Sequence, residues 1–195
     1  AYGGLGQNPF NPAMVGRVAL LISFPLPMTT WVKPAPLFST GSPGPFEGLD
    51  IILSGTPIPD ALTSATVLGH VKTEATRGID AIQALAALGP DAVTGIGWHA
   101  GSMGETASLL ILAGGLMLIA RGLITWHVPA AVVAGVTLPA AIGHAVAPAH
   151  YISAWTHLTS GALMLGAFFI ATDLVTSPAT RLGRLTFGFG CGLLT

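Results

Sequence analysis

The chain has 195 residues, of which 51% are hydrophobic and 8% are charged, and its formal net charge is -1. Typical soluble domains carry about 25% charged residues, so this composition places the protein in a lipid bilayer. The near-neutral charge also excludes the basic surface that nucleic-acid binding requires, and no nucleic acid is expected as a partner.

Long apolar stretches predict an all-α fold, a polytopic bundle of transmembrane helices. A crossing needs about 17 to 25 residues, and four stretches are long enough: Met14 to Trp31, Ala107 to Trp126, Val128 to Ala147 and Trp155 to Thr172. A fifth begins at Leu185. Prolines at 25, 27 and 139 predict kinked or broken helices. We interpret 1–195 as a single integral membrane domain and, because it begins without methionine, as a fragment of a longer protein.

The segment 32–106 separates the first span from the second. It is rich in Pro, Gly, Ser and Thr and holds seven of the 8 acidic residues. Loops of this length are usually functional or disordered. Within it, Ile79 to Trp98 is apolar but interrupted by Gly89, Pro90 and Asp91, which predicts a re-entrant or half-spanning helix pair buried in protein.

One motif in this segment carries chemistry. In Asp60-Ala61-Leu62-Thr63-Ser64-Ala65-Thr66, a threonine among small residues follows an acid by six positions. The pattern resembles the acceptor site of flavin transferases, which join the phosphate of FMN to the last threonine through a phosphoester. It predicts covalent FMN at Thr66, with Asp60, Thr63, Ser64 and Ala65 as the recognised motif. The alternative is ordinary turn chemistry, because short hydroxyl side chains bond nearby backbone groups.

A second stretch, Asp173 to Thr180, has a similar composition but places its acid and final threonine seven residues apart, with Pro178 between them. Proline fixes φ and removes a hydrogen-bond donor. We therefore expect the backbone to present Thr180 differently from Thr66, and only Thr66 to be modified.

The arginines predict sidedness. Arg121 lies in one short loop, and Arg181 and Arg184 lie in the loop two crossings later, which is on the same side of the membrane. The turn between them, Pro148 to Ala154, is on the other side and carries no Lys or Arg. An excess of Lys and Arg marks cytoplasmic loops, so Thr66 is expected on the extracytoplasmic side. One extra crossing near Ile79 would invert this inference.

Other kinds of site are not indicated. Cys191 is the single cysteine, so there is no disulfide framework or Cys-x-x-Cys site. The six histidines lack zinc-like spacing, and neither a metal nor a catalytic residue is predicted. His70, four residues beyond Thr66, could hydrogen-bond a flavin or cap the loop. No Gly-x-Gly-x-x-Gly or P-loop pattern indicates nucleotide binding.

Four stretches resemble a known family in the same order along the chain: Gly3 to Arg17, Thr63 to Thr66, Gly97 to Thr106, and Phe168 to Asp173. The family contains the RnfD component of the Rnf ion-translocating electron-transport complex and, more distantly, the NqrB component of the sodium-pumping NADH:quinone oxidoreductase. Two departures, Leu174 after Asp173 and Val67 after Thr66, occur where proline is usual. They affect loop rigidity more than the acceptor hydroxyl.

The resemblance implies a bacterial inner-membrane, multi-pass protein that carries electrons through covalent FMN and is coupled to Na⁺ or H⁺ movement. It implies an inverted-repeat architecture like that of urea transporters, partner subunits of an Rnf-type complex, and a flavin transferase that loads the site. Such a chain takes part in an oxidoreductase without completing a reaction alone.

A channel or solute transporter is the rival interpretation. Asn11-Pro12-Ala13 matches the aquaporin tripeptide, and broken helices are typical of transporters. Aquaporins, however, use two such tripeptides, and this chain has one copy.

Overall fold

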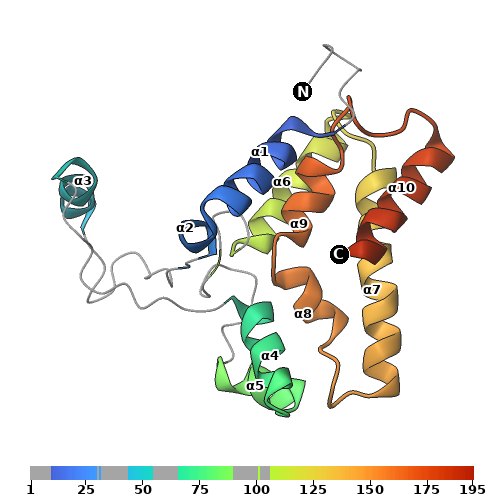
Figure 1. Cartoon of the computed structure of the whole chain (residues 1–195). Coiled ribbons are helices and arrows are strands. Elements are labelled where there is room, and N and C mark those ends of the chain that lie inside the picture. The colour runs from blue at the N-terminus through green and yellow to red at the C-terminus, as the bar shows by residue number, and fades with distance from the viewer. Residues whose placement is uncertain (1–9, 30, 32–43, 55–65, 90–100, 102–105) are drawn as a thin grey trace.

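The computed structural model describes residues 10–29, 31, 44–54, 66–89, 101 and 106–195. Every regular element in these ranges is helical, which confirms the all-α prediction for the described part of the chain. The order is α1 (Pro12–Ser23), α2 (Pro25–Thr29), α3 (Pro45–Ser54), α4 (Val67–Thr76), α5 (Ala81–Ala87), α6 (Ser108–Ala120), α7 (His127–Val146), α8 (Ala154–Thr159), α9 (Leu163–Leu165), the π-helical turn η2 (Gly166–Ile170) and α10 (Arg181–Leu194) (Figure 1).

Helix α7 is the long axis around which the C-terminal half is built. It has 20 residues, a length of about 30 Å at the α-helical rise. Among the described helices it alone is long and apolar enough to cross a membrane, while α1 and α6 are shorter apolar helices. The predicted span Val128 to Ala147 therefore matches to within one residue. Pro139 lies inside α7, and the helix continues through it unbroken.

The other predicted spans are shorter or interrupted. α1 ends at Ser23, and Phe24 leaves helical geometry because the proline that follows disfavours it. α6 has 13 residues and ends before Gly122, which has a φ of 69°. The predicted span from Trp155 to Thr172 is divided into α8, α9 and η2. Broken helices were expected from the prolines, but this last break contains none.

Glycine makes the break between α8 and α9. Ser160 is extended, and Gly161 has a φ of 77°, a conformation that L side chains rarely adopt. The side chains of Thr156, Thr159 and Ser160 are buried around it. Ser108, at the start of α6, donates a hydrogen bond of 2.8 Å from Oγ to the Thr159 carbonyl. A backbone carbonyl released by a helix break inside an apolar core is satisfied in this way.

Close packing of α10 against α7 depends on glycine. A Cβ on Gly188 would lie 2.8 Å from the Val128 carbonyl oxygen, and one on Gly192 would collide with the carbonyl of Val132. Small residues allow such close approach of helix backbones. The two glycines therefore allow α10 to pack closely on α7, whereas a Cβ on Gly190 of the same helix would meet nothing within 4 Å.

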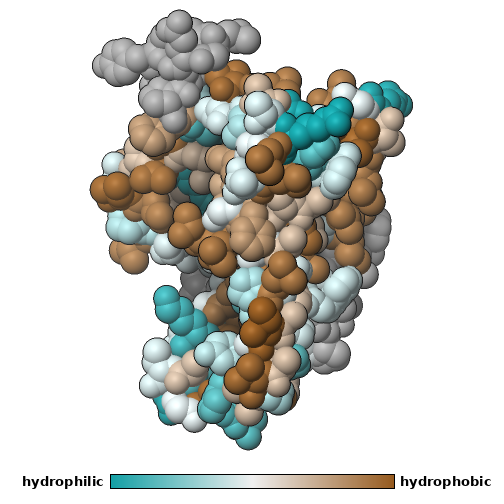
Figure 2. Space-filling view, turned by 90° about the vertical axis from the view of Figure 1, so that its right-hand side faces the viewer, coloured by the Kyte–Doolittle hydropathy of each residue, from teal (hydrophilic) through white to brown (hydrophobic). Residues whose placement is uncertain are grey.

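The apolar core lies where α7 meets α9 and η2. Its buried residues are Val128, Val132, Leu163, Met164, Ala167 and Phe168, with Cys191 packed against them. Figure 2 shows apolar residues across the middle of the face formed by the C-terminal helices, with hydrophilic residues gathered toward both ends. This pattern is the one expected of a protein whose middle is surrounded by hydrocarbon.

Candidate functional site

Thr66 is the residue from which helix α4 starts. It is the N-cap, with φ -62° and ψ 157°, and its Oγ1 accepts a hydrogen bond from the Gly69 amide at 3.2 Å. Its carbonyl accepts from the His70 amide at 2.8 Å. A threonine at this position satisfies one of the amides that a helix start leaves without a partner. The hydroxyl of Thr66 therefore does bind a nearby backbone amide, as the turn-chemistry alternative predicted. This contact places the hydroxyl at the N-terminus of α4.

This N-terminus has the features that a phosphate group needs. The first amides of an α-helix point out of its end and carry partial positive charge, which favours an anion there. Gly69 adds room, because a Cβ at that position would lie 3.0 Å from Thr66 Oγ1. A phosphoryl group on that oxygen would be close to the amides of Val67, Leu68 and Gly69. The residues present therefore fit a phosphoester.

His70 adds an unsatisfied polar atom one turn along α4. Its Nε2 is buried and has no hydrogen-bond partner among the described residues. Buried polar atoms are normally paired, so this nitrogen lacks the partner that a buried imidazole usually has within the described residues. The backbone of His70 continues α4, and the residues of the preceding loop lie outside the described ranges, so whether its side chain caps that loop stays a prediction.

The rest of the predicted motif, Asp60, Thr63, Ser64 and Ala65, lies outside the described residues. Its role as a recognition sequence stays a prediction.

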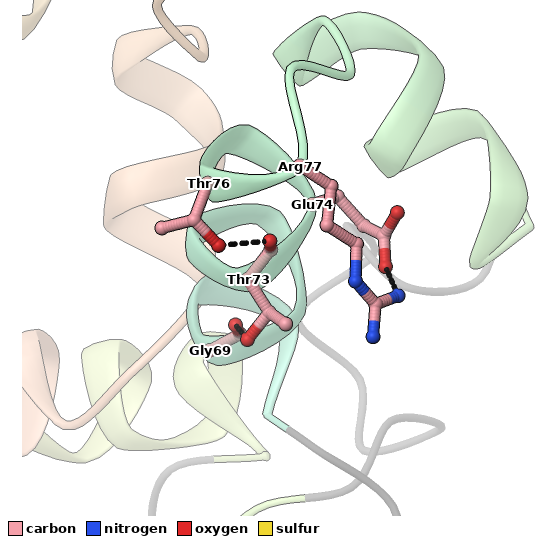
Figure 3. A network of polar contacts seen from close by, with 5 residues as sticks. All are labelled: Gly69, Thr73, Glu74, Thr76 and Arg77. Carbon is pink, nitrogen blue, oxygen red and sulfur yellow. Dashed lines mark hydrogen bonds and ion pairs between the residues drawn. The ribbon is translucent and has the colours of Figure 1, made fainter.

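The body of α4 is held by contacts within the helix (Figure 3). Thr73 Oγ1 donates to the Gly69 carbonyl at 2.9 Å, and Thr76 Oγ1 donates to the Thr73 carbonyl at 2.6 Å. Glu74 and Arg77 form an ion pair of 2.7 Å on another side of the helix. These contacts secure α4 beyond the site without involving Thr66.

The structure corrects the expectation for Thr180. Despite Pro178, Thr180 is also an N-cap, that of α10, with φ -82° and ψ 149°, and its Oγ1 accepts from the Gly183 amide at 3.1 Å. The backbone therefore presents the two threonines in nearly the same way. Proline two residues earlier does not prevent this, because its fixed φ is compatible with an extended approach to a helix start.

The two threonines belong to opposite ends of α7. α4 and α5 form a helical pair, and the Ala81 amide at the start of α5 donates to the Ala149 carbonyl at 3.0 Å, in the turn that follows α7. Thr180 starts the helix whose Arg184 donates to Thr125 Oγ1 at 3.3 Å, just before α7 begins. Figure 1 shows α4 and α5 beside the lower end of α7 and the start of α10 at its upper end.

Part of the predicted re-entrant segment can be compared with the structure. Of Ile79 to Trp98, residues 79–89 are described and contain α5, a helix of seven residues. A helix this short does not cross a bilayer. Within 66–89 the chain therefore makes no crossing that would invert the sidedness of Thr66, and residues 90–98 lie outside the described ranges.

In the described ranges, no three His, Cys, Asp or Glu side chains gather where they could hold a metal ion. The tripeptide Asn11-Pro12-Ala13, which suggested a pore, starts α1. Asn11 Oδ1 accepts from the amides of Ala13 and Met14 at 3.0 and 3.4 Å, and Pro12 occupies the first turn. Helix initiation accounts for both residues.

In the described ranges the fold is all-helical, with one helix long and apolar enough to cross a membrane and two shorter apolar helices, and it is consistent with the class of helical membrane proteins. Comparison with known proteins makes this specific. Residues 1–195 match the family model described as the NQR2, RnfD, RnfE family, and the chain belongs to that family.

Curated relatives agree with the family match. They are the D subunits of ion-translocating oxidoreductase complexes, and the chain is 51% identical to the one from Stutzerimonas stutzeri, 45% identical to the one from Halorhodospira halophila and 42% identical to the one from Rhodobacter capsulatus. Each match covers 99% of this chain, and 53–54% of the relative. The chain therefore spans about half the length of these relatives.

Proposed function

We propose that this chain is the flavin-bearing part of a membrane subunit that passes electrons within an ion-translocating oxidoreductase complex, and that Thr66 carries FMN as a phosphoester. Three things support the proposal: the motif that ends at Thr66, the family to which the chain belongs, and the position of the Thr66 hydroxyl at the start of α4. The motif carries the most weight, because Thr180 also starts a helix with nearly the same geometry and lacks that motif.

The role of α4 follows from its geometry. Esterification replaces the hydroxyl proton of Thr66 by phosphorus, and the added phosphate oxygens carry negative charge. The amides of Val67, Leu68 and Gly69 at the helix start would hold such a phosphate and offset its charge. When bound, FMN supplies the redox chemistry, and the protein supplies position and environment. A covalent link holds the cofactor independently of its binding affinity.

Sidedness supports an extracytoplasmic flavin. Arg184 and the turn before α7 mark one end of that helix, and the α4–α5 pair contacts the other end. The positive-inside rule assigns the arginine-bearing end to the cytoplasm. In a bacterial inner membrane the site then faces the periplasm, where the partner that must reach it is a flavin transferase. The ion moved is Na⁺ or H⁺, and further helices of the longer protein complete an inverted repeat.

Intact mass and peptide mapping test the proposal. The full-length protein, coexpressed with its flavin transferase and purified without reduction of the flavin, is expected to gain the mass of FMN less one water. After proteolysis that mass should stay on the peptide containing Thr66. An unmodified Thr66 peptide from protein that has been exposed to an active transferase would reject the assignment. Modification of another residue would move the site elsewhere.

A further inference from the structure

The start of α5 is built in an unusual way. Asp80 is its N-cap, with φ -62° and ψ 143°, yet within the described residues its carboxylate accepts no capping hydrogen bond from its own helix. Aspartate at this position ordinarily accepts from the amides of the first turn. Here Asp80 Oδ1 lies 3.5 Å from Nδ1 of His150, a residue of the turn that follows α7.

The backbone at the start of α5 contacts the same turn. The Ala81 amide, one of those that a helix leaves without an internal partner, donates to the Ala149 carbonyl at 3.0 Å. Ile152 adds an apolar contact, because it packs against the small cluster of Val71, Ala81 and Ala84 that joins α4 to α5. The cap side chain, the first amide and the apolar face of the α4–α5 pair therefore all contact one turn.

That turn is itself fixed to α7. His144 Nδ1, in the last turn of α7, lies 2.7 Å from the Tyr151 carbonyl oxygen. The amides of His150 and Tyr151 both donate to the Ala147 carbonyl at 3.1 Å. A continuous series of contacts therefore runs from Thr66 through α4 and α5 to Asp80, then to His150 and the long helix α7.

We propose that Asp80 and His150 are positioning residues: together with the Ala81–Ala149 hydrogen bond they hold the α4–α5 pair, and with it the group on Thr66, at a fixed place relative to α7. The reason for holding the helices in place rests on the proposed function, because it assumes a redox group on Thr66. The contacts themselves do not depend on that function. A redox group must be kept at a defined position relative to its electron donor and acceptor.

The exposure of the pair indicates what its loss would do. The side chain of His150 is 74% exposed and that of Asp80 is 43% exposed. Exposed polar side-chain contacts of this kind contribute little to folding, and the core of the bundle is formed elsewhere, around α7, α9 and η2. Removing the contact between Asp80 and His150 should therefore leave the bundle folded and change the position of α4 and α5 relative to α7.

Distance measurement by pulsed electron paramagnetic resonance tests this directly. Nitroxide labels are attached to full-length protein carrying Ala75→Cys on α4 and Leu123→Cys beyond the far end of α7, in a Cys191→Ala background. We expect a narrow distance distribution that Asp80→Asn or His150→Gln widens, because each change removes one side of the contact between α5 and the turn after α7. Unchanged distributions in both variants would overturn the proposal.

Two controls separate positioning from a general effect on structure. Glu74→Gln removes an acid of α4 whose partner, Arg77, is the C-cap of the same helix, and it should leave the distribution narrow. The exchanged pair Asp80→Lys with His150→Glu should restore the narrow distribution, although each change alone widens it. Widening by Glu74→Gln equal to that of Asp80→Asn, or failure of the exchanged pair to restore it, would overturn the assignment.

The same variants distinguish this inference from the flavin assignment. The distances are measured without flavin, so a bare Thr66 would not alter them. In flavinylated complex, Asp80→Asn should keep full covalent flavin fluorescence after denaturation and slow electron transfer into the flavin. Unchanged electron transfer despite a widened distance distribution would overturn the inference that the contact between Asp80 and His150 positions the redox group.

Discussion

Thr66 and Thr180 hold the same position at the starts of two helices, and each hydroxyl oxygen accepts a hydrogen bond from a glycine amide three residues later, at 3.2 and 3.1 Å. Local geometry therefore does not distinguish them as acceptors. The differences are the residues that precede them and the end of α7 near which each helix lies. The chain thus contains a matched internal control for its own proposed modification site.

Thr66→Val should abolish covalent flavin, and Thr180→Val should not. Valine keeps the shape of threonine and removes the oxygen that forms the ester. The loss of flavin would therefore come from the missing hydroxyl and not from altered packing. The measurement is flavin fluorescence under ultraviolet light in a denaturing gel, with full-length protein coexpressed with its transferase. Fluorescence that survives in the Thr66 variant and disappears in the Thr180 variant would show that the acceptor has been misassigned.

Gly69→Ala should reduce flavin loading several-fold while the protein stays folded. The new Cβ would lie 3.0 Å from Thr66 Oγ1, so it would crowd the oxygen that has to form the ester. Alanine favours a helix interior over glycine by about 0.5–1 kcal/mol, so weaker folding of α4 cannot explain a loss.

The control for this prediction is Gly16→Ala in α1, where a Cβ would meet nothing within 4 Å. Both variants are compared by fluorescence per mass of purified protein. Equal loading of the two would show that space beside Thr66 Oγ1 does not limit esterification.

Ala149→Cys and Ala179→Cys should be accessible from opposite sides of the membrane. Both residues are exposed, the first in the turn after α7 and the second just before α10. In a Cys191→Ala background, a membrane-impermeant maleimide applied to cells with a permeabilised outer membrane should label the Ala149 variant only. Lysis should then allow labelling of the Ala179 variant. Labelling of both before lysis, or the reverse order, would contradict the periplasmic assignment of the α4–α5 pair.

Sequence patterns predicted the elements that hydrophobicity alone determines. The 20 residues of α7 match the expected span because no glycine break or cap interrupts them. The break at Gly161 was missed, because an isolated glycine in an apolar stretch is equally compatible with close helix packing. What distinguishes the two roles is a φ of 77°, accompanied by a hydrogen bond from Ser108 to the Thr159 carbonyl, 51 residues away in sequence.

The sequence predicted which residue forms the candidate site, but not how the backbone around it is arranged. The pattern singled out Thr66 but could not show that it would be an N-cap, because α4 is polar and short for a membrane protein. The argument that Pro178 would make the backbone present Thr180 differently was wrong, because Thr66 and Thr180 both start helices. The contact of Asp80 with His150 could not be predicted either, because it joins residues that are brought together only when α7 returns the chain to the same end of the molecule.

Gly192→Ala should destabilise the protein, whereas Gly190→Ala, two residues away on the same helix, should not. The Gly192 Cβ would collide with the carbonyl of Val132, a backbone atom that cannot move aside, so α10 would have to shift away from α7. Overpacking of this kind costs about 1–3 kcal/mol. At Gly190 nothing lies within 4 Å, and alanine should be neutral or slightly stabilising. The Tm of full-length protein in detergent measures the difference, and equal values for the two variants would mean that the helices are not in the close contact described.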